Sequence, residues 1–269
     1  MIGFNGGLIG KDRTTSLSAA VGVWTPGEQI KARRTNIWPV LATTDPFYSS
    51  VSLLLHGDGA NNSTTFTDNS PSPKTVEQNF GNVISTAQSK FNGASIFCNN
   101  TYMEYAANTD FEIGGGDFTI ECWYRGTSTI GSPAIVSKGL HENSAGAYAL
   151  RFAGSDAVRF YIGLGGSDAN IITGTTNVRT SATTASPWNH IAVSKDNGST
   201  RLFINGTQEG STYTTAYTLT TGGKLHIGRF YYNVNDGTVN GYIDDLRITK
   251  GVGRYGANFT APTLPFPDA

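Results

Sequence analysis

Residues 188–250 constrain the fold of this chain more than any other segment, because they alternate short strand-forming runs with turn signals. The runs are WNHIAVSK (188–195), TRLFING (200–206), KLHIG (224–228) and GYIDDLRITK (241–250). The sequence DNGS (196–199) joins the first two runs, and Asn-Gly readily adopts the positive φ that tight hairpin turns require. The segment therefore predicts an antiparallel hairpin followed by two further strands.

The preceding part of the chain shows the same pattern of short extended runs. In DFTIECWYRG (117–126) apolar and polar side chains alternate, as they do in a strand with one buried face. The stretch 173–187, rich in Thr and Ser, is interpreted as a spacer. Further strands are predicted at 50–57, 83–87, 94–99, 103–107, 134–139, 148–154 and 157–164. Many short strands joined by polar turns predict an all-β fold, a two-sheet antiparallel jelly-roll sandwich.

Residues 1–45 differ from this pattern and are interpreted as an extended N-terminal arm. A short helix is predicted over 25–38, with Thr25 as its N-cap. Pro39 ends this helix, because the residue before a proline avoids the helical region. Such an arm cannot form a core of its own, so we expect it to dock on another protein, and an untethered leader is the alternative. Residues 46–269 are predicted to form the sandwich domain, including a Pro-rich C-terminal strap.

The composition argues against several classes of partner. Charged residues make up 14% of the chain, against roughly 25% in a typical domain, and the net charge is −1. Adjacent basic residues occur only at Arg33–Arg34, so binding to nucleic-acid phosphates is not expected. No stretch approaches the ~20 apolar residues of a membrane span, and the first residues lack the basic start of a secretory signal.

The two cysteines, Cys98 and Cys122, lie in separate strand-like runs. Cysteine is among the most frequently buried residue types, so we expect two buried free thiols. A disulfide is the alternative, and it requires the two strands to be neighbours.

Five of the strand-like pieces together resemble a known family. GDFTIECWYRG, SPWNHIAVSK, LFING, LHIGR and GYIDDLRITKGVGRY are similar to the laminin G-like, concanavalin-type jelly-roll domain over about residues 50–260. The residues of GYIDDLRITKGVGRY, together with SPSPKT and QSKFNGAS, are similar to those of laminin G-like domains of bacteriophage virion proteins. The leader GVWTPGEQIKARRTNIWP (22–39) also resembles the N-termini of such proteins.

This resemblance implies a phage virion structural protein, assembled in the host cytoplasm, that displays a laminin G-like domain. Residues 1–45 are then expected to contact other virion proteins of the tail or capsid, and the sandwich is expected to bind host-surface polysaccharide. A homo-oligomer is the expected assembly, without nucleic acid or membrane insertion. The alternative is a purely structural head-decoration or tail-assembly protein with no glycan ligand.

Catalysis is not expected from this sequence. A jelly-roll glycosidase needs two carboxyl groups about 5–9.5 Å apart that flank the sugar bond. Such hydrolases typically show Glu-x-Asp-x-(x)-Glu on a core strand, whereas Glu121 stands alone on its strand. Asp244 and Asp245 are adjacent, and an extended strand would point them to opposite faces. We therefore predict a binding protein and not an enzyme.

Aromatic and polar residues in two loops are the candidates for glycan binding. Flat aromatic rings provide a large packing surface for a sugar, and tyrosine adds a hydrogen-bonding end. The candidates are Tyr213, Tyr217, Arg229, Tyr231, Tyr232, Asn233 and Asp236. The alternative is that these tyrosines pack on the sheet edge or on a neighbouring subunit.

A calcium site is the metal site that the resemblance implies, because laminin G-like domains often hold one calcium ion at the rim of the sandwich. Calcium takes roughly six to eight oxygen ligands. The candidate ligands are Asp58, Asp68, Asp244 and Asp245. The apolar spacing around the last two indicates a β-bulge that would re-aim a side chain. The alternative is that these aspartates cap turns and accept hydrogen bonds from backbone amides.

Overall fold

A computed structural model describes residues 44–127, 131–139, 145–152, 156–165, 168–179, 186–230 and 237–269. The helix predicted over 25–38 lies outside these ranges. Residues Phe47–Phe266 form one compact unit, and a second unit comprises 1–46 and 267–269. Within the described ranges, no helix combines the length and the apolar character needed to cross a membrane.

The described chain consists almost entirely of short strands and turns. Two single-turn 3₁₀ helices occur, η1 (Tyr48–Ser50) and η2 (Thr109–Phe111). The strands are β1 (Val51–Leu55), β2 (Gln78–Asn79), β3 (Val83–Ser85), β4 (Ser95–Asn99), β5 (Met103–Tyr105), β6 (Phe118–Gly126), β7 (Ala134–Lys138), β8 (Tyr148–Phe152), β9 (Ala157–Gly163), β10 (Asp168–Asn177), β11 (Asn189–Asp196), β12 (Ser199–Ile204), β13 (Thr207–Tyr213), β14 (Leu225–Ile227), β15 (Arg229–Phe230), β16 (Gly237–Thr238) and β17 (Asn240–Lys250).

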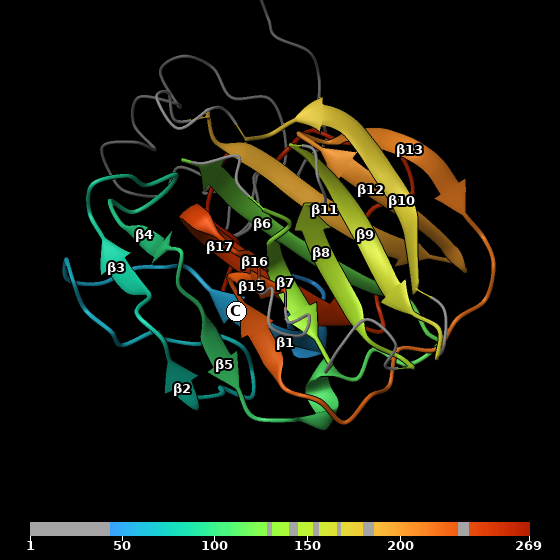
Figure 1. Ribbon diagram of the computed structural model, residues 1–269, viewed down its shortest axis with the longest axis horizontal. Coiled ribbons are helices and arrows are strands. Elements are labelled where there is room, and N and C mark those ends of the chain that lie inside the picture. The colour runs from blue at the N-terminus through green and yellow to red at the C-terminus, as the bar shows by residue number, and fades with distance from the viewer. Residues whose placement is uncertain are drawn as a thin grey trace, which may run out of the picture. The chain divides into compact units, whose positions relative to one another are not determined.

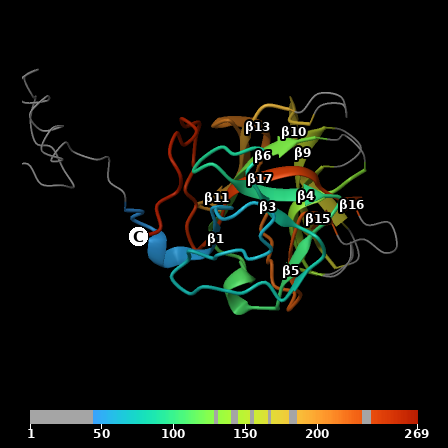
Figure 2. The ribbon, with the colours of Figure 1, turned by 90° about the vertical axis from the view of Figure 1, so that its left-hand side faces the viewer.

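These strands form two stacked antiparallel sheets, which confirms the predicted jelly-roll sandwich (Figure 1, and turned by 90° in Figure 2). The eight-stranded sheet has the order β13-β12-β11-β6-β17-β4-β3, and β1 also pairs with β17. The seven-stranded sheet has the order β10-β9-β8-β7-β14-β5-β2. The short ribbon β15-β16 is separate from both sheets, and β15 packs against β7. Both sheets contain neighbours that are distant in sequence, such as β6 beside β17 and β7 beside β14, as expected for a sandwich built by crossovers.

Alternate side chains from the two sheets fill the space between them. Ile120 and Tyr124 of β6 face Leu150 of β8 and Phe160 of β9 within one continuous buried cluster. The other side chains of the same strands therefore point outward, away from the core.

Both cysteines belong to this core, and both are free thiols, as predicted. Cys98 lies on β4 and Cys122 on β6, and β17 lies between these two strands in the sheet. The separation by a whole strand rules out the disulfide that was the alternative.

Two strands occupy segments that the sequence analysis interpreted as irregular. β10 covers the start of the predicted spacer 173–187, and β13 covers the beginning of the loop that contains Tyr213. These two predictions were wrong because both strands lie at sheet edges. An edge strand has one hydrogen-bonded neighbour and needs few apolar side chains, and β13 is half-exposed or exposed along its whole length.

The two edge strands are tied to each other by a side chain. Glu209 of β13 accepts hydrogen bonds from the backbone N–H groups of Thr175 (2.7 Å) and Thr176 (3.0 Å) of β10. The carboxylate thus satisfies edge amides that a neighbouring chain could otherwise pair with. The sandwich is closed on this side without a continuous sheet.

The chain after β17, residues 251–266, lies across the outer face of the eight-stranded sheet, and we call it the C-terminal strap. Tyr255 and Phe259 of the strap stack at 3.6 Å, and both rings contact Phe203 and His190 of the sheet. Phe203 and His190 point away from the core, yet both are fully buried. The strap therefore covers this part of the face.

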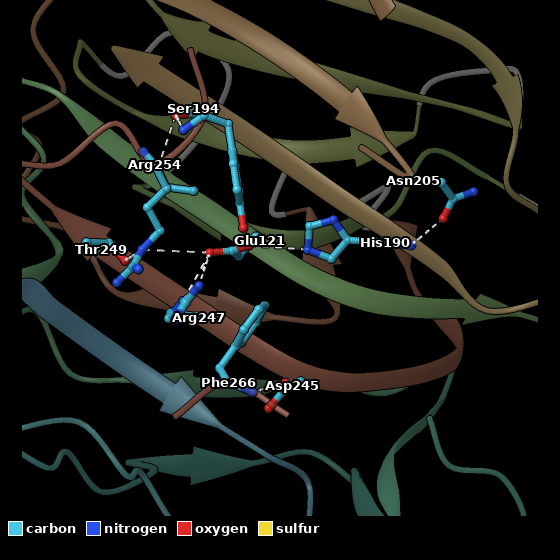
Figure 3. Close-up of polar contacts among 11 residues, drawn as sticks. Glu121, His190, Ser194, Asn205, Asp245, Arg247, Thr249, Arg254 and Phe266 are labelled. Carbon is cyan, nitrogen blue, oxygen red and sulfur yellow. Dashed lines mark hydrogen bonds and ion pairs between the residues drawn. The ribbon is translucent and has the colours of Figure 1, made fainter. Parts of the chain in front are cut away.

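Glu121 of β6 is the polar centre under the strap (Figure 3). Its carboxylate accepts hydrogen bonds from Arg247 Nε (3.0 Å) and Nη2 (2.8 Å) on β17. It also accepts one from the hydroxyl of Tyr255 in the strap (2.7 Å), and His190 Nε2 lies 3.2 Å away. The Glu121 side chain has no solvent exposure, so these contacts compensate for its lost hydration.

The charges around Glu121 decide its protonation. Burial alone would raise the pKa of this carboxyl, but the charge of Arg247 and the hydrogen bond from His190 outweigh burial and hold the pKa well below its usual range. Glu121 is therefore ionised in the folded protein at neutral pH.

We predict that Glu121→Gln strongly destabilises the fold. The variant keeps the size of the side chain but leaves Arg247 without its buried counter-charge, and breaking a buried ion pair typically costs about 3–5 kcal/mol. Urea unfolding at pH 7 should show a decrease of that order in the free energy of unfolding. The matched control is Glu77→Gln, which breaks an exposed pair with Lys224 (44% and 41% exposed) and should cost no more than about 1 kcal/mol.

The pH dependence of the difference supplies a second readout. Because the pKa of Glu121 is lowered in the folded state, its contribution is present above the unfolded pKa of about 4.5 and is lost as the pH falls further. The stability gap between wild type and Glu121→Gln should shrink as the pH is lowered from 5 to 3. Equal losses for both variants at pH 7, or a constant gap, would contradict the role given to Glu121.

Candidate functional site

The outer face of the seven-stranded sheet carries a line of residues that crosses six strands. Gln78, Glu104, His226, Ser137, Ala149 and Tyr161 lie opposite one another, in this order, from β2 to β9. Directly opposed residues of neighbouring strands point to the same face of a sheet. Their chain neighbours, such as Met103, Leu225 and Leu150, belong to the core, so this line lies on the outer side of the sheet. The line is nevertheless buried from Glu104 to Tyr161, with Phe230 of β15 packed against Ala149 and Tyr161.

At the β2 end of the line, two aromatic rings form a stacked pair. The rings of Phe80 and Tyr102 lie 4.2 Å apart with an interplanar angle of 20°. The guanidinium of Arg229 lies 4.3 Å from the centre of the Tyr102 ring. Phe80 is 37% exposed, so it presents an aromatic ring to the solvent at the edge of the face.

Glu104, next to Gln78 in the line, lies among basic side chains. Its carboxylate accepts a hydrogen bond from Lys224 Nζ at 2.7 Å, and Lys224 also binds Glu77 at 2.8 Å. His226 Nε2 and Arg229 Nη1 lie 3.9 and 4.0 Å from the same carboxylate. The face thus holds several hydrogen-bonding groups in fixed positions.

At the β9 end, β15 places a further ring on the face. The Ser137 hydroxyl donates to the carbonyl of Arg229 (2.7 Å), which fastens β15 to β7. Phe230 then lies edge-on to Tyr161 with 5.4 Å between ring centres, and the guanidinium of Arg151 lies 3.7 Å from the Phe230 ring. A small pocket opens here, lined by Ser137, Lys138, Gly139, Ala147, Tyr148, Tyr161 and Phe230.

This face combines aromatic rings with fixed charged and hydrogen-bonding groups, which are the elements that orient a polar ligand with apolar ring faces. Part of the opposite face of the sandwich is covered by the C-terminal strap, under which His190 and Phe203 are buried. The exposed groups at the β2 end of this face suit a polar ligand better than an apolar one.

The predicted glycan-binding residues are only partly found on this face. Arg229 lies on it, between Tyr102 and Glu104. Tyr217 is buried in the core cluster, and its hydroxyl is hydrogen-bonded to Thr200 Oγ1 (2.6 Å). Tyr213 packs half-buried beside it, so these two tyrosines have the packing role that was the alternative. The remaining candidates, Tyr231, Tyr232, Asn233 and Asp236, lie outside the described residues.

Sequence reasoning did not identify Phe80, Tyr102, Arg151, Tyr161 or Phe230. Alternation within β9 does place Tyr161 on the face opposite to Phe160, and that signal was available in the sequence. Nothing in the sequence pairs it with Phe230, because the contact depends on β15 lying against β7.

Two of the four candidate calcium ligands have both carboxylate oxygens occupied by protein groups. Asp68 accepts hydrogen bonds from the amides of Leu54, Ser70 and Lys74 and from the Ser70 hydroxyl. Asp245 contacts His56 Nδ1 through one oxygen and accepts the Phe266 N–H (2.6 Å) through the other. Both residues thus fix turns and the strap, which is the capping role that was the alternative.

Asp245 also forms the predicted β-bulge. The pairing of β17 with β6 shifts register between Asp244 and Arg247, and Asp245 adopts a φ of 52°. A left-handed conformation at a residue other than glycine re-aims the chain locally. As a result the Asp245 carboxylate turns toward the strap, where it binds Phe266.

Asp58 and Asp244 differ from this pair in that each has one carboxylate oxygen without a hydrogen bond to the described chain. Asp244 Oδ2 accepts the amides of Lys90 and Phe91, and Asp58 Oδ2 accepts the Asn92 side chain. Burial raises the pKa of Asp244 to about 7, and the charges of Asp245 and Asp58 add to the rise. The described residues hold no group of three or more His, Cys, Asp or Glu side chains in metal-binding proximity.

Solved structures with a similar fold include three domains of longer proteins. The binding domain of Paraclostridial Mosquitocidal Protein 1 has a TM-score of 0.56 at 16% identity, covering 76% of this chain and 49% of that chain. Domain 4 of AbnA, a GH43 extracellular arabinanase from Geobacillus stearothermophilus, has a TM-score of 0.53 at 17% identity, covering 76% and 94%. The binding domain of Botulinum Neurotoxin DC has a TM-score of 0.52 at 15% identity, covering 76% and 49%.

This chain spans about half the length of the two toxin binding domains. At these identities the likeness shows the fold alone. A comparison with curated proteins found no match. The laminin G-like resemblance seen in the sequence is confirmed by a family model, Laminin_G_3 of the concanavalin A-like lectin/glucanases superfamily, which matches residues 99–252, more than half of the chain, and the chain belongs to this family.

Proposed function

We propose that this protein is a non-catalytic glycan-binding protein of a bacteriophage virion, and that the outer face of the seven-stranded sheet is its binding surface. The observation that carries the proposal is the β2 end of this face, where Phe80 (37% exposed) stacks on Tyr102 beside the exposed ion pair of Lys224 and Glu77. The opposite sheet supports this choice, because the strap already covers part of its outer face.

Two of the similar structures were solved with carbohydrate-related ligands. The arabinanase domain was determined in complex with arabinotriose, and the neurotoxin binding domain in complex with SialylT. These ligands belong to those proteins, but they show that domains built on this fold occur in sugar-binding contexts. They support a glycan ligand here without identifying it.

Binding without hydrolysis is supported by the acidic residues of the face. A glycosidase needs two carboxyl groups that flank the sugar bond. Glu104 and Glu77 instead turn to the same cation, Lys224 Nζ, at 2.7 and 2.8 Å. Because both carboxylates bind the same lysine, they lie on one side of it. They are therefore not placed on opposite sides of a ligand, as hydrolysis requires.

The virion part of the proposal rests on the sequence. The leader at 22–39 resembles the N-termini of phage tail or head-attached proteins, and residues 1–45 are the segment that would contact other virion proteins. The laminin G-like domain would then be displayed on the particle, as a homo-oligomer, toward the host-surface polysaccharide. The alternative is a purely structural head or tail protein, which would use the same arm but would bind no glycan.

We also propose calcium as a cofactor, held by Asp58 and Asp244. Both carboxylates have an oxygen that no described group occupies, and a cation near Asp244 would bring the pKa of this residue back down from about 7. Backbone carbonyls and water would complete the roughly six to eight oxygens that calcium takes. Its role would be to fix the rim of the sandwich near residues 58 and 90–92.

We predict that Phe80→Ala weakens glycan binding. Removing a phenyl ring that a sugar covers loses about 1.5–3 kcal/mol of apolar burial, or roughly tenfold or more in Kd. The full chain would be screened on an array of bacterial surface polysaccharides, and the Kd of the best ligand measured by calorimetry. The matched control is Phe97→Ala, which removes one ring of the stacked pair Phe97–Tyr242 on the other sheet (4.6 Å, 25°).

Loss of binding in Phe80→Ala and not in Phe97→Ala is the expected result. The reverse pattern would move the site to the eight-stranded sheet. Absence of binding by the wild type to every polysaccharide would leave the structural head or tail role as the better account.

We predict that calcium raises the melting temperature of the wild type relative to EDTA. A ligand at 100 times its Kd stabilises the native state by about 2.7 kcal/mol when it does not bind the unfolded chain. Asp244→Asn should abolish the calcium effect. Asp68→Asn is the control: it removes a turn cap and lowers the melting temperature, but the shift caused by calcium should persist. A wild-type melting curve that is identical in calcium and EDTA would remove the metal from this proposal.

We predict that deleting residues 1–40 leaves the protein folded but prevents its incorporation into phage particles. The compact unit Phe47–Phe266 contains the complete sandwich, so circular dichroism and the melting transition should be retained. Incorporation would be measured in purified particles by complementation of a phage lacking the gene, with the full-length Phe80→Ala variant as the control that still assembles. Efficient incorporation of the deleted chain would disprove the anchoring role.

A further inference from the structure

The outer face of the seven-stranded sheet contains two arginines directly opposite each other. Arg151 of β8 pairs in register with Arg159 of β9, and Arg159 is also opposite Thr173 of β10. Arg159 lies two residues before Tyr161 on the same strand, so the side chains of Arg159 and Tyr161 are on the outward side of the sheet.

The two arginines have different surroundings. Arg151 is buried, its guanidinium lies 3.7 Å from the Phe230 ring, and its Nε donates to the carbonyl of Phe152 at 3.4 Å. Arg159 is half-buried, and its Nε is shielded from solvent without a hydrogen-bond partner. Buried donors normally have partners, and each exception requires an explanation.

No nearby acidic group of the described chain compensates this charge. The closest acidic residue in sequence within those ranges, Asp156, is engaged by Arg179 Nε at 3.4 Å. Apart from Arg151, the outward neighbours of Arg159 on its own strand and across it are Ala157, Tyr161 and Thr173, which carry no charge. The guanidinium therefore faces a surface on which an anion would find a donor.

We propose that the glycan bound on this face is acidic and that Arg159 binds its anionic group. The inference rests on the proposed glycan-binding function. The planar guanidinium offers a fork of N–H donors that matches a carboxylate and can also pair with the oxygens of a sulfate or phosphate ester. Arg151 on the neighbouring strand lies in register with Arg159, but it is buried against Phe230.

The experiment uses the full chain and matched polymers. Bacterial polysaccharides that contain uronic or sialic acids would be tested in native form and after carbodiimide reduction of their carboxyl groups, and sulfated galactans would be tested beside desulfated ones. Wild-type affinity should fall at least about tenfold on carboxyl reduction or desulfation, the loss expected for one charge-assisted hydrogen-bonded pair. Comparing the two polymer series shows whether the anion is a carboxylate or a sulfate.

Arg159→Gln should lower the affinity for the acidic polymer to that of its neutral form and leave the affinity for the neutral form unchanged. Arg159→Lys keeps the charge without the fork and should retain part of the preference. The control is Arg201→Gln on β12, whose guanidinium donates to Ser199 and lies on the other sheet, and it should change neither affinity. The melting temperature of free Arg159→Gln should equal or exceed that of the wild type, because the substitution removes a shielded donor that makes no hydrogen bond.

The outcomes separate this inference from the function on which it rests. Equal binding of acidic and neutral polymers, or an Arg159→Gln variant that keeps the acidic preference, would overturn the acidic-glycan inference and leave glycan binding intact. Binding to no polymer in either form would overturn both.

Discussion

The buried carboxylate of Glu121 is the interaction on which the two-sided character of this sandwich depends. Arg247 supplies two hydrogen bonds to it from the neighbouring strand, and Tyr255 supplies one from the strap. Because the charge is fully buried, the strap contributes both a hydrogen bond and the exclusion of water from the pair that Glu121 forms with Arg247. The fold thereby commits part of one outer face to its own C-terminal segment, while the β2 end of the other sheet keeps Phe80 exposed.

The bulge at Asp245 is the backbone feature that makes this arrangement possible. In a regular strand Asp244 and Asp245 would point to opposite faces, whereas the register shift lets Asp244 bind the amides of Lys90 and Phe91 and lets Asp245 bind the strap at Phe266. The spacing of apolar residues in GYIDDLRITK was sufficient to predict the bulge from the sequence. The partners of the two aspartates were not predictable, because they come from segments about 20 to 150 residues away.

The same limit explains which parts of the fold and of the site could be predicted. Strands with a strong alternation, such as β6 and β9, were identified because one buried face determines their pattern. The edge strands β10 and β13 were missed because each pairs with a neighbouring strand on one side only and needs few apolar side chains. The sequence analysis favoured loop tyrosines as the rings that contact a sugar. Tyr217 instead lies in the core, where its hydroxyl is hydrogen-bonded to Thr200, and the exposed ring is that of Phe80.

The binding face itself is a property of strand order, which no local pattern encodes. Arg159 could be read as an outward residue from β9 alone, but its opposition to Arg151 requires the β8–β9 register, and the ring beside it requires β15 to lie against β7. The Nε donor of Arg159 is shielded from solvent without a hydrogen-bond partner, and a sandwich with a continuous core between its layers can tolerate that cost. The unsatisfied donor is therefore better explained by what the face binds than by how the chain folds.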